Sequence, residues 1–177
     1  MNFNKPGNKK AVLALLFVIL TIAIMFFIPI KQAVVFEYQN KGKVIAYFLI
    51  KEDRTFKIKY THSIHLTDVV ESYTITEDGR IKLFELMYED FAIGMPEKAS
   101  DGETFEQKDG KYYIKNMKRF FPSFDLRLGK VRANHRMILQ GEEYVLTDYI
   151  EPGTWVRIKA KKINLFEVLK GVNILGK

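Results

Sequence analysis

One stretch near the start of the chain restricts its architecture more than any other. Residues 11–30, AVLALLFVILTIAIMFFIPI, form a run of twenty residues without a charge. As a helix that rises about 1.5 Å per residue, such a run is about 30 Å long, which is the hydrocarbon thickness of a bilayer. The run therefore predicts a transmembrane helix.

The flanks of this run predict its orientation. Residues 1–10 contain three lysines and no acidic residue, and positive charge of this kind stays on the cytoplasmic side of a membrane. A cleaved signal peptide is the alternative, but its apolar region usually spans about 7–15 residues before a small-residue cleavage site. This run is longer and has no such site. We expect a cytoplasmic N-terminus (1–10), a retained signal anchor (11–30) in the cell membrane and an extracytoplasmic domain (31–177).

The remainder of the chain has the pattern of an all-β protein. Short β-branched and aromatic runs alternate with turn sequences whose glycine and asparagine residues supply the positive φ angles of hairpin turns. These turn sequences are Asn40-Lys41-Gly42, Glu77-Asp78-Gly79, Lys108-Asp109-Gly110, Gln140-Gly141 and Glu151-Pro152-Gly153. About ten short strands connected in this way predict an antiparallel β-sandwich or a barrel-like domain.

Two segments of the domain stand out from this pattern. Residues 94–110, GMPEKASDGETFEQKDG, are the one long polar stretch, and we expect a surface loop there. Residues 163–169, INLFEVL, fit either a last strand or an amphipathic C-terminal helix, because their apolar positions match both spacings.

Cysteine content and charge exclude several classes of protein. The chain has no cysteine, so it forms no disulfide and carries no lipidated cysteine. Residues 31–107 have a net charge of −4 and residues 108–177 one of +8. A basic half can bind nucleic acid or anionic lipid, but a domain outside the membrane rarely meets nucleic acid, and we expect none as a partner. The basic residues Arg157, Lys159 and Lys161 alternate with apolar ones, which predicts a half-buried strand with a basic outer face.

The stretch YTHSIHLTDVVESY holds two of the three histidines and a glutamate within twelve residues. A hairpin with a two-residue loop at Leu66-Thr67 would sort its side chains into one apolar face and one polar face. In that register His62 lies opposite Glu71 among apolar neighbours, and His65 lies opposite Asp68 at the exposed tip. An unpaired buried polar group costs about 1–3 kcal/mol, so we predict an enclosed His62–Glu71 pair that fixes the strand register.

Metal binding and serine chemistry are alternatives for the same residues. Histidines three apart point to opposite faces of a strand, so a metal site would need distant ligands such as His135 or Asp148. Ser63 points away from His62 in a strand, and the chain has no G-x-S-x-G motif. We therefore expect no catalytic residue, metal or cofactor. A polar site of His62, Ser63 and Glu71 that lines a ligand pocket remains the alternative.

Two motifs in the chain resemble a family of small proteins known as domain of unknown function 1850. The first motif is YTHSIHLTDVVESYTI, in which His62, Ser63 and Glu71 match the family pattern. The second is FAIGMP, in which Gly94 and Pro96 match a Gly-x-Gly-x-Pro-like turn that we expect to shape a binding edge. The resemblance covers roughly residues 44–160.

The sequence departs from the family pattern at two positions. His65 stands where the family usually has glutamate, and Ala92 stands where the first turn glycine is expected. These differences question a charge-based role at position 65 and predict a stiffer turn.

Family members look like accessory proteins encoded beside TAXI-type TRAP transporters, which take up organic anions. The resemblance implies a non-catalytic accessory or binding protein whose partner is a transporter membrane subunit or a substrate-binding protein. The alternative is an extracytoplasmic hydrolase or small-molecule sensor that uses a polar site at His62 and Glu71.

Overall fold

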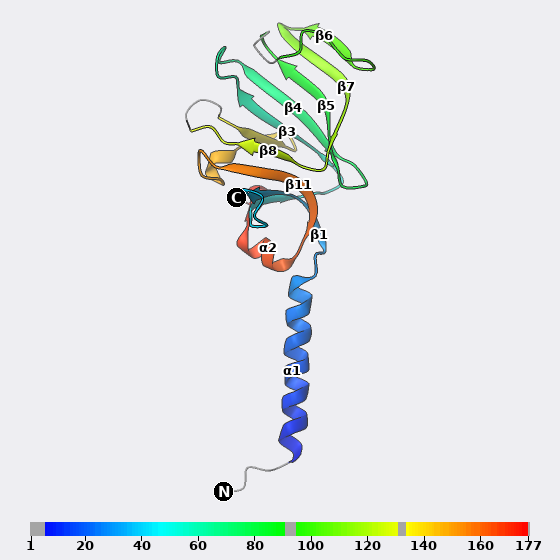
Figure 1. Cartoon of the computed structure of the whole chain (residues 1–177), viewed down its shortest axis with the longest axis vertical. Coiled ribbons are helices and arrows are strands. Elements are labelled where there is room, and N and C mark those ends of the chain that lie inside the picture. The colour runs from blue at the N-terminus through cyan, green and yellow to red at the C-terminus, as the bar shows by residue number, and fades with distance from the viewer. Residues whose placement is uncertain (1–5, 91–94, 131–133, 177) are drawn as a thin grey trace.

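The structure, a computed structural model, describes residues 6–90, 95–130 and 134–176. A long helix, α1 (Pro6–Phe27), projects from a β-domain, with β1, β11 and α2 nearest to it (Figure 1). Its segment Lys9–Phe27 is long and apolar enough to cross a membrane, and none of it is buried against the domain. The helix ends just before Ile28-Pro29, because proline disfavours helical geometry in the residue before it. The chain therefore carries an apolar helix of the kind found in single-pass anchors and signal sequences.

The domain consists of two sheets whose neighbouring strands are antiparallel, except that β12 is parallel to β2. The five-stranded sheet has the order β12-β2-β1-β11-β8, with β1 (Lys31–Tyr38), β2 (Val44–Leu49), β8 (Phe124–Arg127), β11 (Trp155–Ile163) and β12 (Val172–Asn173). The seven-stranded sheet has the order β10-β9-β3-β4-β5-β7-β6, with β3 (Thr55–Thr61), β4 (Asp68–Ile75), β5 (Ile81–Tyr88), β6 (Thr104–Lys108), β7 (Lys111–Phe121), β9 (Arg136–Leu139) and β10 (Glu142–Val145). The prediction of an all-β domain after an apolar N-terminal helix is confirmed.

The main core lies between the two sheets and draws on both of them. Strand β1 is buried on both faces, as its continuous apolar run AVVF indicates. Val34 and Phe36 point into the main core, whereas Ala33 and Val35 belong to a smaller cluster on the opposite face. The helix α2 (Leu165–Lys170) packs Val168 against that smaller cluster. The five-stranded sheet is thus covered on one side by its partner sheet and on the other by α2.

The glycine-containing turns lie where the sequence places them. Left-handed backbone occurs at Asn40, Gly42, Gly79, Asp109, Gly110, Gln140, Gly141 and Gly153, with φ between 52° and 88°. Each of these residues belongs to one of the five turn sequences, and glycine and asparagine adopt such angles at little cost. Turn chemistry therefore predicts where many of the strands end along the chain.

The two segments that stand out in the sequence both contain regular secondary structure. Residues 94–110 are not all loop, because β6 forms a hairpin with β7, and Phe105 packs against the core. Residues 165–170 adopt the helical alternative. The backbone N–H of Glu167 donates to Asn164 Oδ1 (2.9 Å), and Asn164 N donates to Glu167 Oε2 (3.1 Å), a capping box that begins α2.

Candidate functional site

The hairpin of β3 and β4 has a different register from the one that the sequence predicts. Ile58 pairs with Glu71 and Tyr60 with Val69, a shift of four residues relative to the prediction. Two-residue hairpin loops favour glycine or asparagine at their positive-φ positions, and neither residue type stands at Leu66-Thr67. The chain instead closes a longer turn, in which His62 N donates to Thr67 O (2.8 Å) and Leu66 N donates to His62 O (3.0 Å).

The predicted His62–Glu71 pair is therefore wrong. The partner of Glu71 on β3 lies four residues before His62, which is about 13 Å along a strand. His62 Nδ1 accepts a weak hydrogen bond from Ile64 N (3.4 Å), and the rings of His62 and His65 lie 5.9 Å apart in the same turn. Ser63 is exposed in that turn. The hydrolase or sensor alternative, as formulated on this pair, has no geometric support.

The predicted pair at the hairpin tip, His65 with Asp68, is also absent from the described contacts. Asp68 lies opposite Thr61 and forms an ion pair with Lys59 (3.0 Å), which bridges to Glu143 (3.2 Å) as well. The partner of Asp68 is thus a lysine on the neighbouring strand.

Glu71 lies on the inner face of the seven-stranded sheet, where β4 directs Val69 and Tyr73 into the core. The Tyr73 hydroxyl donates a hydrogen bond to Glu71 Oε2 (2.7 Å). This contact follows from the two-residue period of a strand, which puts residues 71 and 73 on one face. Burial raises the pKa of Glu71 above its ordinary value of 4.5, and the hydrogen bond from Tyr73 only partly opposes that rise.

Two further polar side chains lie on this face, Tyr60 near Glu71 and His135 near Tyr60. Tyr60 is the next inward residue along β3, and burial together with the charge of Glu71 raises its pKa to about 12. The ring of His135, just before β9, lies 5.7 Å from the ring of Tyr60. His135 is 8% exposed, burial lowers its pKa, and within the described residues its Nδ1 has no hydrogen-bond partner.

These four residues, Glu71, Tyr73, Tyr60 and His135, form what we call the inner-face cluster. Its carboxyl, phenol and imidazole groups can hold a proton or exchange hydrogen bonds with a polar ligand. The sequence pattern indicates Glu71, but it offers His135 only as a distant metal ligand and does not place it near Glu71, because β9 is brought beside β3 only by long-range pairing. The inner-face cluster is the candidate functional site.

The substitution Glu71→Gln should remove a destabilising contribution to folding that grows as the pH rises. The folded carboxyl binds its proton more tightly than the unfolded one, so ionisation destabilises the wild-type fold as pH rises above about 4.5. Glutamine keeps an acceptor for Tyr73 but carries no charge. The advantage of the variant should grow from pH 4 to pH 7 in urea unfolding curves of the full chain in detergent.

The single tryptophan, Trp155, provides the fluorescence signal for that measurement. The control is Glu77→Gln, which removes an exposed carboxylate from the turn after β4. If the unfolding free energy of Glu71→Gln changes with pH in the same way as those of the control and the wild type, the burial of the Glu71 charge is contradicted.

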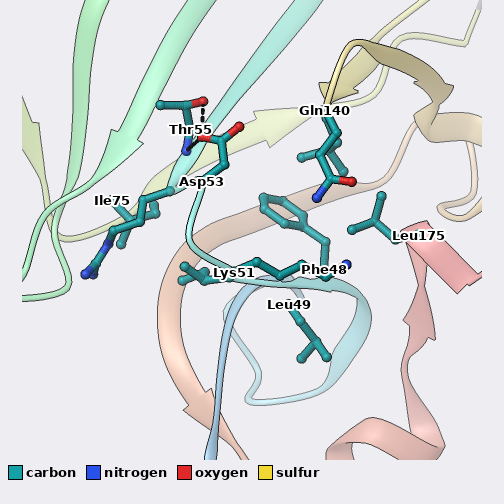
Figure 2. Close-up of a pocket in the computed structure, with 11 residues that line it drawn as sticks. Phe48, Leu49, Lys51, Asp53, Thr55, Ile75, Gln140 and Leu175 are labelled. Atoms are coloured by element: carbon teal, nitrogen blue, oxygen red, sulfur yellow. Dashed lines mark hydrogen bonds between the residues drawn. The ribbon is translucent and has the colours of Figure 1, made fainter.

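Two hollows lie elsewhere on the domain, beside the segment between β2 and β3. The first is a cavity of about 10 Å³, lined in part by Phe48, Asp53, Gln140 and Leu175 (Figure 2). A cavity needs about 10–15 Å³ to hold one water, so this one has no room for a larger ligand. Asp53 there accepts hydrogen bonds from the N–H and hydroxyl of Thr55 (2.9 and 2.6 Å). The Asp53 carboxylate therefore stabilises the local turn.

The second hollow, of about 230 Å³, is lined by charged side chains of both signs. Lys161 there pairs with Glu167 (2.6 Å), and Asp78 pairs with Arg80 (2.7 Å). The charges of Lys161 and Asp78 are therefore satisfied within the chain.

The second motif lies partly outside the described residues, which do not include Gly94. Pro96 is described, and its carbonyl accepts a hydrogen bond from the hydroxyl of Tyr88, which is buried at the end of β5. This bond ties the end of the motif to the seven-stranded sheet. Among the described residues, no three His, Asp or Glu side chains are placed to hold a metal ion.

The comparisons with known proteins place the chain in a family. No curated protein and no solved structure matches it. A family model described as Domain of unknown function (DUF1850) matches residues 56–146, a span that runs from β3 to the end of β10 and includes all four residues of the inner-face cluster. Since this match covers just over half of the sequence, the chain belongs to the DUF1850 family.

Proposed function

We propose that the protein is a membrane-anchored extracytoplasmic β-domain that acts as a non-catalytic accessory or binding protein of a TRAP-type uptake transporter. The observation that carries the anchor is α1, in whose apolar segment Lys9–Phe27 no residue is buried against the domain. Water is a poor solvent for such a surface, and a bilayer core of about 30 Å matches its length.

The position of α1 supports an outward-facing role for the domain. The helix leaves from the side of β1, and β5, β6 and β7 lie at the opposite end of the domain (Figure 1). With residues 1–10 in the cytoplasm, the lysines obey the positive-inside rule. The seven-stranded sheet would then extend away from the membrane, where it is accessible to a partner.

The transporter as partner rests on what the resemblance of the two motifs implies for members of the family. Two components are candidates, a transporter membrane subunit and a soluble substrate-binding protein. The membrane subunit can be reached by α1 and the domain alike, whereas the binding protein can be reached only by the domain.

Co-purification tests the association. The full chain with a C-terminal affinity tag, extracted in mild detergent from cells that also make the TRAP permease and its binding protein, should retain at least one of them after light crosslinking. An isolated monomer under the same conditions would count against the proposal.

The matched control replaces residues 11–27 with an unrelated single span and leaves the domain unchanged. Retention of the partner by this variant would assign the contact to the β-domain, and loss would assign it to α1. An unrelated tagged single-span protein reports nonspecific capture.

A further inference from the structure

The helix α2 has an apolar ridge that stays largely exposed although it touches the end of α1. Leu165, Phe166 and Leu169 are 42%, 42% and 68% exposed. They fall within about 100° of arc at 3.6 residues per turn, so they form one stripe. On another side of the helix, Val168 packs onto the five-stranded sheet, and the Tyr47 hydroxyl donates to its carbonyl (3.3 Å). The orientation of the ridge is therefore fixed by the fold.

The ridge lies at the level where α1 ends. Ile30 N donates to Ile163 O (3.1 Å), and Lys31 pairs with Ile163, so the exit of α1 and the start of α2 are joined through β1 and β11. The rings of Phe27 and Phe166 lie 5.7 Å apart. Phe27 is the last residue of α1, which places Phe166 at the same depth as the end of the span.

The surroundings of the ridge match the boundary between acyl chains and headgroups. A largely apolar hollow of about 430 Å³ opens between the last turns of α1 and Leu165. The exposed Lys31 lines it, and the exposed Lys170 places its Nζ 5.8 Å from the ring of Phe166. Lysines in this position extend their amines to headgroups while apolar neighbours enter the acyl region.

We propose that the α2 ridge is seated in the outer leaflet of the bilayer that holds α1, so that the domain rests on the membrane at two points. The occupant of the ridge is lipid, because its apolar surface continues that of α1 and ends in lysines. This inference rests on the proposed membrane anchor and adds to it a fixed orientation of the domain. The seven-stranded sheet then faces away from the bilayer at a fixed height.

The absence of cysteine allows this to be tested on the full chain with single-cysteine variants. Leu169→Cys probes the ridge, Leu16→Cys probes the middle of α1, and Phe120→Cys probes an exposed apolar residue of β7. Each variant is labelled with an environment-sensitive fluorophore and placed in nanodiscs of phosphatidylcholine and phosphatidylglycerol, with or without lipid that carries a nitroxide on its acyl chain.

We expect nitroxide lipid to reduce the emission at position 169 by a fraction comparable to that at position 16, with little loss at position 120. Quenching at 16 without quenching at 169 would overturn the seating and leave the anchor intact. No quenching at either position would overturn both. A blue-shifted but unquenched label at 169 would mean that protein covers the ridge, which also overturns the proposal. Since all three side chains are at least 42% exposed, none of these substitutions removes a core residue.

Discussion

Replacing Phe56 by alanine should cost the domain about 3–5 kcal/mol of unfolding free energy, the usual range for a buried phenylalanine. Phe56 is 1% exposed and lies between two other rings. Its centroid is 5.6 Å from Phe48, on the five-stranded sheet, and 5.1 Å from Tyr73, on its own sheet. Alanine would leave a cavity at the point where the two sheets interlock.

The loss should fall in the upper part of that range because Phe56 belongs to a continuous row of rings. Tyr73 stacks in turn on Phe124 of β8 (5.1 Å, 11°), and Phe124 contacts Phe121 (6.3 Å). The row passes from one sheet to the other and back. Aromatic pairs of this kind contribute about 0.5–1.5 kcal/mol beyond the area they bury.

Urea unfolding of the full chain in detergent, followed by Trp155 fluorescence, measures the effect. The matched control is Phe120→Ala on β7, where the ring is 42% exposed and lies under Arg80 (4.9 Å). Its loss should stay within about 1 kcal/mol, the range of an exposed cation–π contact. Equal losses in the two variants would mean that Phe56 does not join the sheets.

The part of the fold that the sequence predicts correctly depends on glycine. The five turn sequences with glycine mark real reversals of the chain, since their positive φ angles are cheap only for glycine and a few polar residues. The turn between β3 and β4 contains no glycine. There the two-residue period still sorts the faces correctly, but it does not distinguish registers that differ by an even number of residues.

This ambiguity of register decides which contacts of the candidate site can be predicted from the sequence. Glu71 and Tyr73 share a face in every such register, so their contact is readable from the sequence. The partner of Glu71 across the hairpin is not, and the predicted His62–Glu71 pair fails for this reason. His135 joins the inner-face cluster through the pairing of β3 with β9, which separates contacting residues by about eighty positions.

The basic strand β11 illustrates a second limit. The alternation of Arg157, Lys159 and Lys161 with buried apolar residues is confirmed, but the basic face is not simply solvated. Arg157 pairs with Asp125 (2.7 Å), Lys161 with Glu167 (2.6 Å), and Lys159 with Glu37. Charge counts along the chain do not reveal such pairing, because the acidic partners come from other elements. The positive charge available to an external partner is therefore smaller than the sequence indicates.

The second large effect is expected from Lys159→Met, which should cost about 3 kcal/mol at neutral pH. The Glu37 side chain is only 3% exposed, whereas that of Lys159 is 29% exposed. Without the lysine, the buried carboxylate of Glu37 keeps one hydrogen bond, which it accepts from Gly42 N (2.7 Å). Removing one partner of a fully buried pair costs about 3–5 kcal/mol, and the partial exposure of Lys159 places this case near the lower limit.

Two variants separate the buried charge from the loss of a lysine. Arg157→Met on the same strand breaks a pair whose side chains are 30% and 45% exposed, and it should cost at most about 1 kcal/mol. The double variant Glu37→Gln/Lys159→Met removes the charge as well as its partner and should recover part of the loss. A double variant no more stable than Lys159→Met would argue that the lysine acts through packing of its alkyl chain.

The pH dependence of stability gives the sharpest distinction, because the contribution of Glu37 should reverse in sign when Lys159 is removed. Burial alone would raise the pKa of Glu37, but in the wild type Lys159 and the Gly42 N–H lower it below 4.5. The pair therefore stabilises the fold above pH 4.5, and this contribution is lost as the pH falls through the lowered pKa. Without Lys159 the effect of burial dominates, so the variant should lose stability as the pH rises from about 4.5 to 7. Urea midpoints across this range should show the deficit of Lys159→Met growing with pH, and a deficit independent of pH would contradict a buried, ionised Glu37.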